Sequence, residues 1–460
     1  MKVPALVRLA GILMLQLPVL ARILRVPLEY STIQSAIDAS EEGDTVLVAP
    51  GTYTGNGNRD ISFKGKAITV CSEAGPETCI IDCEGSDTEN HRGFYFVNRE
   101  DRRSVLEGFT IRNGYVSYAV GPGSDTRCGG AIFSNYWANP TIRNCIFEGN
   151  YAYNGGAGIA CSDALILNCV LRNNRTEYGG PWLGFGSITC GRAVVANCVV
   201  VSNYGGGISC GSAKISNCLV AGNQGGGIVI KGQAEALISN CTVVCNLSSS
   251  HGAGLYFFDG AARNSSIVTN CIIWGNRAKL GGNQISSGYD PRGGPRPITT
   301  VELRYCFIES GPDVGYWWGE AWHKILGEGV ILDADPCFAR PGYWDPNGTP
   351  DDPYDDIWVD GDYHLKSQAG RWDPVSQAWV KDDVTSPCID AGDPNSPLGL
   401  EPFPNGGRIN MGAYGGTQEA SKSYFGGPTC ETIVSGDIDG NCKVDLHDLA
   451  ILASHWLEGW

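Results

Sequence analysis

The chain has 460 residues, including 63 glycines, 12 tryptophans, 19 tyrosines and 13 phenylalanines. Hydrophobic residues make up 42% and charged residues 18%, which is too apolar for a disordered chain, and the glycines lack the every-third-residue pattern of collagen. The net charge is −16 and is unevenly distributed. Residues 331–460 hold 7 basic and 22 acidic side chains, whereas residues 141–280 hold 9 basic and 5 acidic ones. No cluster of lysine and arginine suits a phosphate backbone, so we expect no nucleic-acid partner.

The first 21 residues have the pattern of a secretory signal peptide. Lys2 and Arg8 come before or at the start of the apolar residues 9–21, and Val19 and Ala21 suit cleavage after Ala21. This stretch is shorter than the ~20 apolar residues that span a bilayer, and no later segment approaches that length. We therefore expect a signal peptide over residues 1–21, a secreted or cell-surface protein, and no stable membrane span.

The next segment predicts a helix followed by a strand. The stretch TIQSAIDAS is amphipathic, which indicates a helix over residues 33–40. A strand is expected at residues 45–48 and a turn at Pro50 and Gly51. A helix in this place would seal the open end of a stack of strands.

Two short phrases then alternate along the middle of the chain. The first is NCIFEGN at Asn144, with equivalents at Asn168, Asn197, Asn217, Asn240 and Asn270 and a degenerate copy at Tyr305. The second is a glycine cluster followed by an apolar residue, near residues 129, 155, 205, 225 and 252. A unit of roughly twenty to thirty residues cannot bury an apolar face alone, so successive units must stack. The repeat predicts a solenoid of parallel strands.

Stacking at about 4.8 Å places equivalent residues in columns. One column holds the cysteines of the first phrase: Cys145, Cys169, Cys198, Cys218, Cys241, Cys271 and Cys306. The preceding asparagines form a second column at a bend, because asparagine tolerates left-handed φ and its amide can bond the amide one coil away. Cys161, Cys190 and Cys210 form a third, continued by Ile230. We expect mostly free thiols, because side chains in register point the same way, and no metal, because no histidine joins them.

The pattern TIQ-AID-A-GDTV-V-PGTY, followed by Asn-Cys and Gly-Gly coils, resembles the right-handed parallel β-helix proteins of the pectin-lyase-like superfamily. The resemblance covers residues 28–420 and implies an all-β fold. The β-helix would occupy residues 28–330 with the N-terminal cap helix at its start. The reaction stays open, because this superfamily includes polysaccharide lyases, glycoside hydrolases, pectin esterases, adhesins and proteins of no known activity.

Residues 331–425 break the repeat and are rich in Asp, Pro and Trp. The phrases DADPCF, DYHL, SPCIDAGDP and MGAYGG resemble the closing segment of secreted planctomycete-type β-helix proteins, which implies an irregular C-terminal cap. Cys337 and Cys388 lie outside the cysteine columns, and a disulfide between them would close a loop of about fifty residues and stabilise it by about 4 kcal/mol. The acidic run at residues 351–362 suits a second calcium ion or, alternatively, a solvated loop.

Residues 437–448 read DIDGNCKVDLHD and predict a calcium site. Five oxygen-bearing side chains and one carbonyl stand at loop positions 1, 3, 5, 9, 12 and 7, a spacing that suits Ca²⁺ as cofactor. These residues are Asp437, Asp439, Asn441, Asp445, Asp448 and, through its carbonyl, Lys443. The following helix is amphipathic, and we expect it to bury Leu449, Leu452 and Trp456 on one side.

Residues 430–460 together resemble one half of a type I dockerin, a small module with a calcium loop and an exit helix. The resemblance implies docking to a cohesin-like protein through Leu446 and His447. Two features depart from that family. Cys442 stands at the sixth loop position, where EF-hand loops use glycine, and the chain ends after one repeat where dockerins have two. A Cys430–Cys442 disulfide would fix the loop in place of the missing half.

Aromatic and basic side chains between the two phrases and on the coils are the candidate carbohydrate-binding residues: Tyr153, Tyr178, Trp182, Tyr204, Arg175, Arg192 and Lys214. Exposed rings would stack on sugars, and the alternative is that the rings pack on one another. The basic side chains would attract a uronate chain. The nearby carboxylates Glu148, Asp163 and Glu177 stand in no catalytic phrase and are expected to be solvated turn charges, so no catalytic residue is predicted.

Two functions fit these patterns. The first is a secreted β-helix protein that binds or processes an extracellular, acidic polysaccharide, as a polysaccharide lyase or glycoside hydrolase if it is an enzyme, and is attached through its calcium module. The alternative is a non-catalytic cell-surface or adhesion solenoid that acts as a structural spacer. A groove with paired carboxylates, or with Arg or Lys beside calcium, would favour an enzyme, and a surface of asparagine and serine would favour the spacer.

Overall fold

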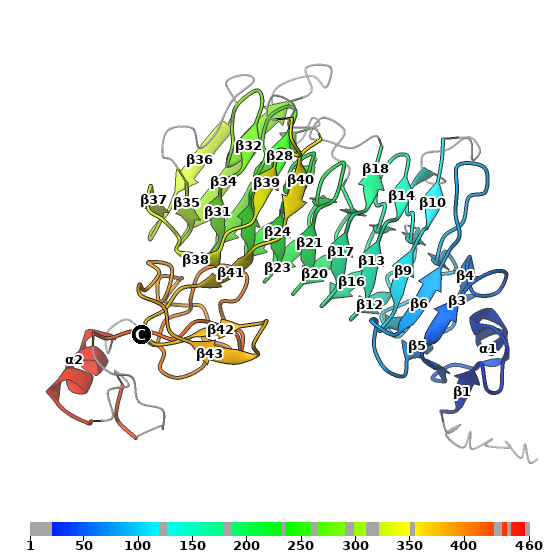
Figure 1. Cartoon of the computed structure of the whole chain (residues 1–460), viewed down its shortest axis with the longest axis horizontal. Helices are drawn as coiled ribbons and strands as arrows, with labels where there is room; N and C mark the ends of the chain where they lie inside the picture. The colour runs from blue at the N-terminus through cyan, green and yellow to red at the C-terminus, as the bar shows by residue number, and fades with distance from the viewer. Residues whose placement is uncertain are drawn as a thin grey trace, which may run out of the picture.

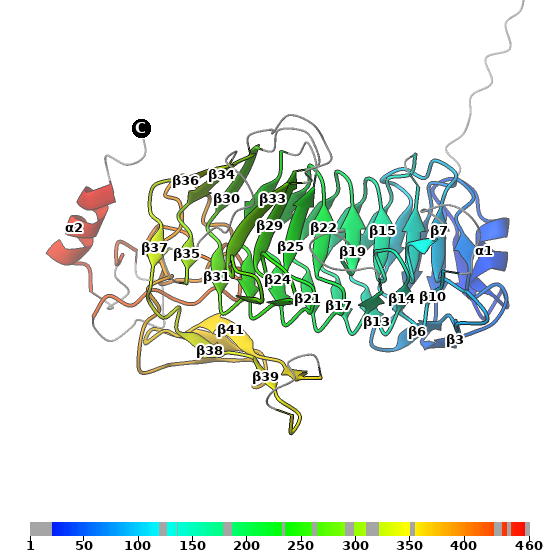
Figure 2. The same ribbon diagram turned by 90° about the horizontal axis from the view of Figure 1, so that it is seen from above.

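The computed structural model describes residues 21–118, 127–135, 137–177, 186–231, 235–259, 265–289, 299–309, 322–349, 355–426, 435–438 and 443–455. In these residues the strands stack into a right-handed parallel β-helix, which confirms the predicted fold class (Figures 1 and 2). Within the same ranges, no helix has the length and apolar character needed to cross a membrane. Residues 1–20 of the predicted signal peptide lie outside the described residues.

Three long parallel sheets form the faces of the β-helix in the described ranges. The first sheet contains β4 (Ile61–Ser62), β7 (Phe94–Phe96), β11 (Ile132–Ser134), β15 (Ile159–Cys161), β19 (Ile188–Cys190), β22 (Ile208–Cys210), β25 (Ile228–Lys231), β29 (Leu255–Asp259) and β33 (Ile285–Tyr289). The second contains β1 (Ile23–Val26), β2 (Thr45–Val48), β5 (Thr69–Ser72), β8 (Val105–Glu107), β12 (Thr141–Arg143), β16 (Leu165–Leu167), β20 (Val194–Ala196), β23 (Lys214–Ser216), β26 (Leu237–Ser239), β30 (Ser265–Thr269), β34 (Thr299–Arg304) and β36 (Trp322–Leu326).

The third sheet contains β3 (Gly51–Tyr53), β6 (Cys79–Asp82), β9 (Thr110–Arg112), β13 (Ile146–Glu148), β17 (Val170–Arg172), β21 (Val199–Val201), β24 (Leu219–Ala221), β27 (Thr242–Val244), β31 (Ile272–Trp274), β35 (Phe307–Ile308) and β37 (Ile331–Leu332). Each coil passes through the first, second and third sheet in turn, as β15, β16 and β17 do. Some coils add a short strand after the third sheet: β10 (Tyr115–Val116), β14 (Tyr151–Ala152), β18 (Arg175–Thr176), β28 (Leu247–Ser248) and β32 (Arg277–Ala278).

The register confirms the stacking that the repeat predicts. Ile142 of β12 pairs with Ile166 of β16, which in turn pairs with Val195 of β20. All three side chains are fully buried, whereas the residues on either side of Ile166 are partly exposed. Three-residue strands with one central inward side chain therefore build one continuous apolar core along the axis of the β-helix.

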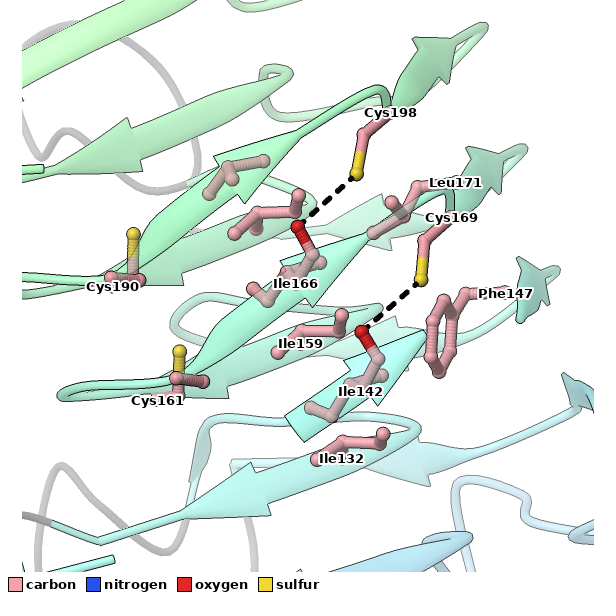
Figure 3. Close-up of a cluster of buried hydrophobic side chains, with 14 of the residues drawn as sticks. Ile132, Ile142, Phe147, Ile159, Cys161, Ile166, Cys169, Leu171, Cys190 and Cys198 are labelled. Atoms are coloured by element: carbon pink, nitrogen blue, oxygen red, sulfur yellow. Dashed lines mark hydrogen bonds between the residues drawn. The ribbon is translucent and has the colours of Figure 1, made fainter. Parts of the chain in front are cut away.

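The cysteine column lies inside this core, as Figure 3 shows. The Cys169 thiol donates to the carbonyl of Ile142 at 3.8 Å, and the Cys198 thiol donates to the carbonyl of Ile166 at 3.7 Å. All seven cysteines of the column are buried free thiols, as predicted. Burial raises the pKa of the Cys145 thiol to about 12. In the shorter column, Cys161, Cys190, Cys210 and then Ile230 are in register.

The corner asparagines before these cysteines adopt left-handed backbone conformations, with φ between 49° and 54°, which confirms their predicted role at a bend. These residues are Asn144, Asn168, Asn197, Asn217, Asn240 and Asn270. Amide hydrogen bonds between neighbouring corners link Asn168 to Asn144 at 3.1 Å and Asn270 to Asn240 at 3.3 Å. The predicted ladder along the corners is therefore only partly formed.

A continuous amide ladder lies instead at the last asparagine of each phrase. From Asn150 to Asn246, each side-chain Nδ2 donates to the Oδ1 of the asparagine one coil further on, at 2.9–3.0 Å, and the last, Asn276, donates to Gln284. The ladder consists of the buried residues Asn150, Asn174, Asn203, Asn223, Asn246 and Asn276. The sequence signal for it was the asparagine at the seventh position of all six NC phrases.

The N-terminal end is closed by α1 (Ile33–Ala39), with β2 following at the predicted residues (Figure 1). Ile33, Ala36 and Ile37 are buried, and Thr32 and Ser35 form a capping box that satisfies the first free N–H groups of the helix. The helix covers the open end of the core and thereby protects the first coil from further strand pairing.

Residues 338–426, the C-terminal cap, fold back along the β-helix. They contain three antiparallel strand pairs that the sequence pattern did not predict: β38 (Phe338–Arg340) with β41 (Asp362–Leu365), β39 (Tyr343–Asp345) with β40 (Ile357–Val359), and β42 (Arg371–Asp373) with β43 (Ala378–Val380). The cap covers the outer face of the third sheet, where Val201, Leu219 and Phe307 pack with Phe338 and Met411 in a second core. Figure 2 shows β38, β39 and β41 beside β24 and β31.

The predicted Cys337–Cys388 disulfide is not formed, because both residues are free thiols. The Cys337 thiol points to the carbonyl of Asp335 in its own turn at 3.5 Å, and Cys388 is buried in the second core. Burial raises the pKa of Cys388 far above its ordinary value. Near Cys337 and Cys388, the cap is held by apolar packing in the second core and by the hydrogen bond from the Ser386 hydroxyl to the carbonyl of Pro336 at 2.7 Å.

Candidate functional site

A strip of aromatic and guanidinium side chains crosses four successive coils just after the third sheet. Tyr115 of β10 is in register with Tyr151 of β14, Tyr151 with Arg175 of β18, and Arg175 with Tyr204. We call these four residues the tyrosine strip. Parallel stacking spaces them at about 4.8 Å per coil.

The side chains of the tyrosine strip pack in pairs. The Tyr115 and Tyr151 rings are stacked, with centroids 4.2 Å apart and planes 13° apart. The guanidinium carbon of Arg175 lies 4.4 Å from the centroid of the Tyr204 ring, and its nitrogens also contact Glu177 at 3.0 and 3.1 Å. Tyr204 is 42% exposed. The strip therefore presents ring edges, hydroxyl groups and one shared cation to solvent.

A second aromatic cluster adjoins the first two coils of the strip. The Tyr118 and Tyr153 rings meet edge to face at 5.0 Å, and the Arg127 guanidinium lies 4.1 Å from the Tyr118 centroid. Tyr118 is 59% exposed. The rings pack on one another, as one prediction has it, and they also keep exposed surface, which the other prediction, stacking on sugars, requires. Tyr178 and Trp182 lie outside the described residues.

The structure does not bring all candidate carbohydrate-binding residues together. Arg175 and Tyr204 are in contact and Tyr153 lies on a neighbouring coil. Lys214 instead begins β23, and Arg192 precedes β20 by two residues. Both side chains are exposed along the second sheet, and the third sheet separates them from the strip in every coil.

The candidate carboxylates of the coils are paired with arginines. Glu148 contacts Arg172 of the next coil at 2.7 Å, Asp163 contacts Arg102 at 2.7 Å, and Glu177 contacts Arg175 at 3.0 Å. Exposed pairs of this kind contribute little to stability. Their pairing agrees with the expectation that they are surface charges, and it places no two of these three carboxylates together in a cleft.

A groove of about 960 Å³ runs between the corner asparagines and the C-terminal cap. Its floor includes Asn168, Asn197 and Asn217, and its opposite wall includes Thr417 and Glu419. Sequence reasoning missed this groove. The corner asparagines were identified, but the sequence pattern carries no signal for where the MGAYGG segment folds back.

A buried ionic cluster supports the cap wall of this groove. His364 Nδ1 lies 2.6 Å from Asp362 and Nε2 lies 3.3 Å from Glu419, while the ring stacks on Tyr414 at 3.7 Å. Burial alone would lower the pKa of His364, but the hydrogen bonds to Asp362 and Glu419 outweigh burial and raise it. Arg371 adds a second cation beside Asp362 at 3.2 Å.

Lys231 is a titratable side chain that sequence reasoning did not single out as a site. It ends β25 in the first sheet, in register with Phe258 of β29. Burial lowers the pKa of Lys231 to about 8. A lysine with such a pKa can accept a proton near neutral pH.

The predicted calcium loop is described in part. Asp437 and Asp448 are 3% and 2% exposed, and Asp448 accepts the N–H groups of Ile438 at 2.6 Å and Asp445 at 2.7 Å. The carboxylate at loop position 12 thus holds the backbone of positions 2 and 9. Asp439, Asn441, Cys430 and Cys442 lie outside the described residues. Within the described ranges, no group of three or more His, Cys, Asp or Glu side chains is placed to hold a metal ion.

The exit helix forms as α2 (Leu446–His455), but one prediction about it is wrong. Leu449 and Leu452 are 56% and 43% exposed instead of buried, and Leu446 is 80% exposed. Trp456 lies outside the described residues.

Comparison with known proteins adds little beyond the fold. A family model described as "Disaggregatase related" matches residues 348–392, which belong to the C-terminal cap. No match was found among curated proteins. The stacked parallel sheets of the described residues show the fold of the chain, a parallel β-helix.

Several solved structures have a similar arrangement of strands. Pectate lyase Pel9A is 14% identical, with a TM-score of 0.48, over 85% of this chain and 96% of that chain. The catalytic domain of GH87 α-1,3-glucanase in complex with nigerose is 12% identical, with a TM-score of 0.38, over 69% of this chain and 65% of that domain. The A-module of the Azotobacter vinelandii mannuronan C-5 epimerase AlgE6 is 15% identical, with a TM-score of 0.35, over 66% of this chain and 94% of that chain.

Proposed function

We propose that this protein is secreted and binds an extracellular polysaccharide along the tyrosine strip. The observation that carries this proposal is the in-register placement of Tyr115, Tyr151, Arg175 and Tyr204 on successive coils. Side chains repeated along a line suit an extended polymer better than a compact small molecule. Tyrosine offers sugars an apolar surface and a hydroxyl group, which are the two features that sugar rings contact.

An acidic polysaccharide is the favoured ligand, because Arg175 is the cation at the centre of the strip. A uronate carboxylate would bind the guanidinium in competition with Glu177, which already contacts it. Binding should therefore be weak per sugar and sensitive to salt. The proposal concerns binding and assigns no catalytic residue, because the coil carboxylates Glu148, Asp163 and Glu177 are each paired with arginine.

The C-terminal module is proposed to bind calcium and to attach the protein to a partner. The spacing of the oxygen-bearing side chains supports the fit of Ca²⁺, and Asp437 and Asp448, at loop positions 1 and 12, are both buried. Asp439, Asn441, Asp445 and the Lys443 carbonyl would complete the ligand set. The exposed side of α2, with Leu446 beside His447, is the proposed contact for a cohesin-like protein.

The test is affinity electrophoresis and calorimetry of the full chain with polygalacturonate and alginate. Tyr204→Ala and Arg175→Ala should each weaken binding by roughly fivefold, which is equivalent to about 1 kcal/mol. Tyr343→Ala is a matched control, because Tyr343 is 57% exposed on β39 and lies in the cap. Failure of the unmodified protein to bind any acidic polysaccharide would overturn the proposal in favour of the structural spacer.

A further inference from the structure

The groove between the β-helix and its cap crosses five coils. Its floor contains the corner residues Asn168, Asn197, Asn217, Asn240 and Asn270. Four coil intervals of about 4.8 Å give this floor a length of about 19 Å. The wall on the cap side contains Leu400, Ile409, Tyr414, Thr417, Gln418 and Glu419.

Residues of the cap form hydrogen bonds with the corner amides at the C-terminal end of the groove. Asn217 donates to the carbonyls of Ala413 at 3.2 Å and Gly415 at 2.7 Å, and Asn240 donates to the carbonyl of Asn410 at 3.3 Å. Asn270 donates to the Ser396 hydroxyl at 3.0 Å and accepts the N–H group of Asp393 at 2.7 Å. These amides therefore have a structural role, because they hold non-repeating residues of the cap against the corner column.

The next two corners are open to solvent. Asn197 is exposed, and its side-chain amide makes no hydrogen bond to the described residues. Asn168 is also exposed and uses its Nδ2 on Asn144, at 3.1 Å, which leaves its Oδ1 available. An amide offers a donor and an acceptor in one plane, and a sugar hydroxyl can satisfy both.

The groove is almost uncharged. Among the described residues that line it, Glu419 is the single carboxylate, and there is no lysine or arginine. Glu419 lies 3.3 Å from Nε2 of His364, and hydrogen bonds to Asp362 and Glu419 raise the pKa of that histidine. The lining offers a uronate no lysine or arginine, and it offers a basic peptide one carboxylate, which His364 already contacts.

We propose that this groove binds an uncharged polysaccharide, with sugar hydroxyls hydrogen-bonded to Asn168 and Asn197 on the floor and to Thr417 and Gln418 on the wall. The repeat of one amide per coil favours a ligand that is itself periodic. The apolar side chain of Leu400, which is 64% exposed, suits the face of a sugar ring. This site lies on the corner between the second and third sheets, so it is separate from the tyrosine strip at the far end of the third sheet.

The test compares Asn197→Gly with Asn113→Gly in the full chain. Glycine tolerates the left-handed φ of both residues, 54° and 55°, so each variant removes an exposed amide without straining the backbone. Asn113 does not line the groove, its side chain donates to Asp82, and it serves as the control. Calorimetry with laminarin, xylan, glucomannan and pullulan should show binding of at least one neutral polysaccharide, weakened roughly fivefold by Asn197→Gly and unchanged by Asn113→Gly.

Two further variants separate this site from the proposed function. Gln418→Ala should also weaken binding of the neutral polysaccharide, whereas Tyr204→Ala should leave it unchanged. The inference is overturned if no neutral polysaccharide binds or if Asn197→Gly binds as the unmodified protein does. Retention of an unstructured, uncharged peptide in place of the polysaccharides, lost in Asn197→Gly, would show that the occupant is a polypeptide and would also overturn it.

Discussion

The side-chain amide of Asn174 donates to Oδ1 of Asn203, one coil further on, at a distance of 3.0 Å, and both residues are buried. Asn203 Oδ1 also accepts the backbone N–H of Asn174, and its Nδ2 donates to the carbonyls of Leu171 and Val201. Each amide thus satisfies polar groups of its own coil and of the neighbouring coil. This relationship, repeated along the β-helix, fixes the height of each coil.

Replacing Asn203 with leucine should strongly destabilise the protein. The change leaves buried N–H and carbonyl groups without partners, at about 1–3 kcal/mol each, so we expect a loss of at least about 3 kcal/mol in the free energy of unfolding. Urea denaturation followed by circular dichroism measures this loss. Asn197→Gly, at an exposed corner, should lose less than about 1 kcal/mol, and equal losses in the two variants would contradict the proposed role of the ladder.

The buried thiols should make the protein unstable in alkali. Burial raises the pKa of Cys79 to about 11 and that of Cys145 to about 12, from an ordinary value of 9. The folded protein therefore holds protons that the unfolded chain releases, and stability present below pH 9 is lost as the pH rises toward 12. Thermal unfolding at pH 7, 9 and 10.5 should show a falling midpoint, whereas a flat profile would mean that the column is not buried as thiols.

The same thiols should differ in their reaction with an alkylating reagent. Cys337 is partly exposed and should be modified in the native protein, whereas Cys169 and Cys198 should react only after denaturation. Peptide mapping by mass spectrometry reads out each site. A Cys337–Cys388 disulfide, seen as a linked peptide under non-reducing conditions, would contradict the free thiols of the structure.

Glu401 should couple the stability of the cap to pH. Its Oε1 accepts the N–H groups of Asn410 and Gly416, both at 2.8 Å, yet burial raises its pKa to about 7 from 4.5. A raised carboxyl pKa contributes stability that is complete below pH 4.5 and is lost as the pH rises through 7. Glu401→Gln keeps the accepting oxygen without the charge. It should be more stable than the unmodified protein at pH 8, by on the order of 3 kcal/mol, and nearly equal to it at pH 4.

Removal of calcium should affect the C-terminal module and leave the β-helix intact. Chelation is expected to increase proteolysis around residues 437–448, because the loop would lose the cation that its oxygen ligands are proposed to bind. Limited proteolysis with and without EDTA tests this expectation, with Asp448→Asn as the matched variant. Identical cleavage under both conditions would contradict the proposal that this module binds calcium.

The sequence predicted most of the β-helix because its information is local and periodic. The NC phrases predicted that Cys169 and Cys198 stack, and the amphipathic segment at residues 33–40 predicted α1. The features that were missed depend on contacts between distant segments. Asn217 meets Gly415 across 198 residues, and Trp344 donates to the carbonyl of Cys245 at 2.8 Å across 99. No periodic pattern records where a non-repeating cap folds back on a repeating core.

The candidate site was predictable to a similar degree. Tyr204 was named from its place between the phrases and Arg175 for its charge, and the structure joins them. Tyr115 and Tyr151 complete the strip because parallel register aligns short strands after the third sheet. Arg192 and Lys214 were named for their charge, but charge alone does not indicate which face of a coil a side chain occupies.

The most direct measurement is a crystal structure of the full chain with a bound acidic oligosaccharide. The account predicts sugar density running across the coils beside Tyr115, Tyr151 and Tyr204, with a carboxylate near Arg175. Density confined to the outer face of the first sheet, near Lys231, with none beside the tyrosines, would contradict it.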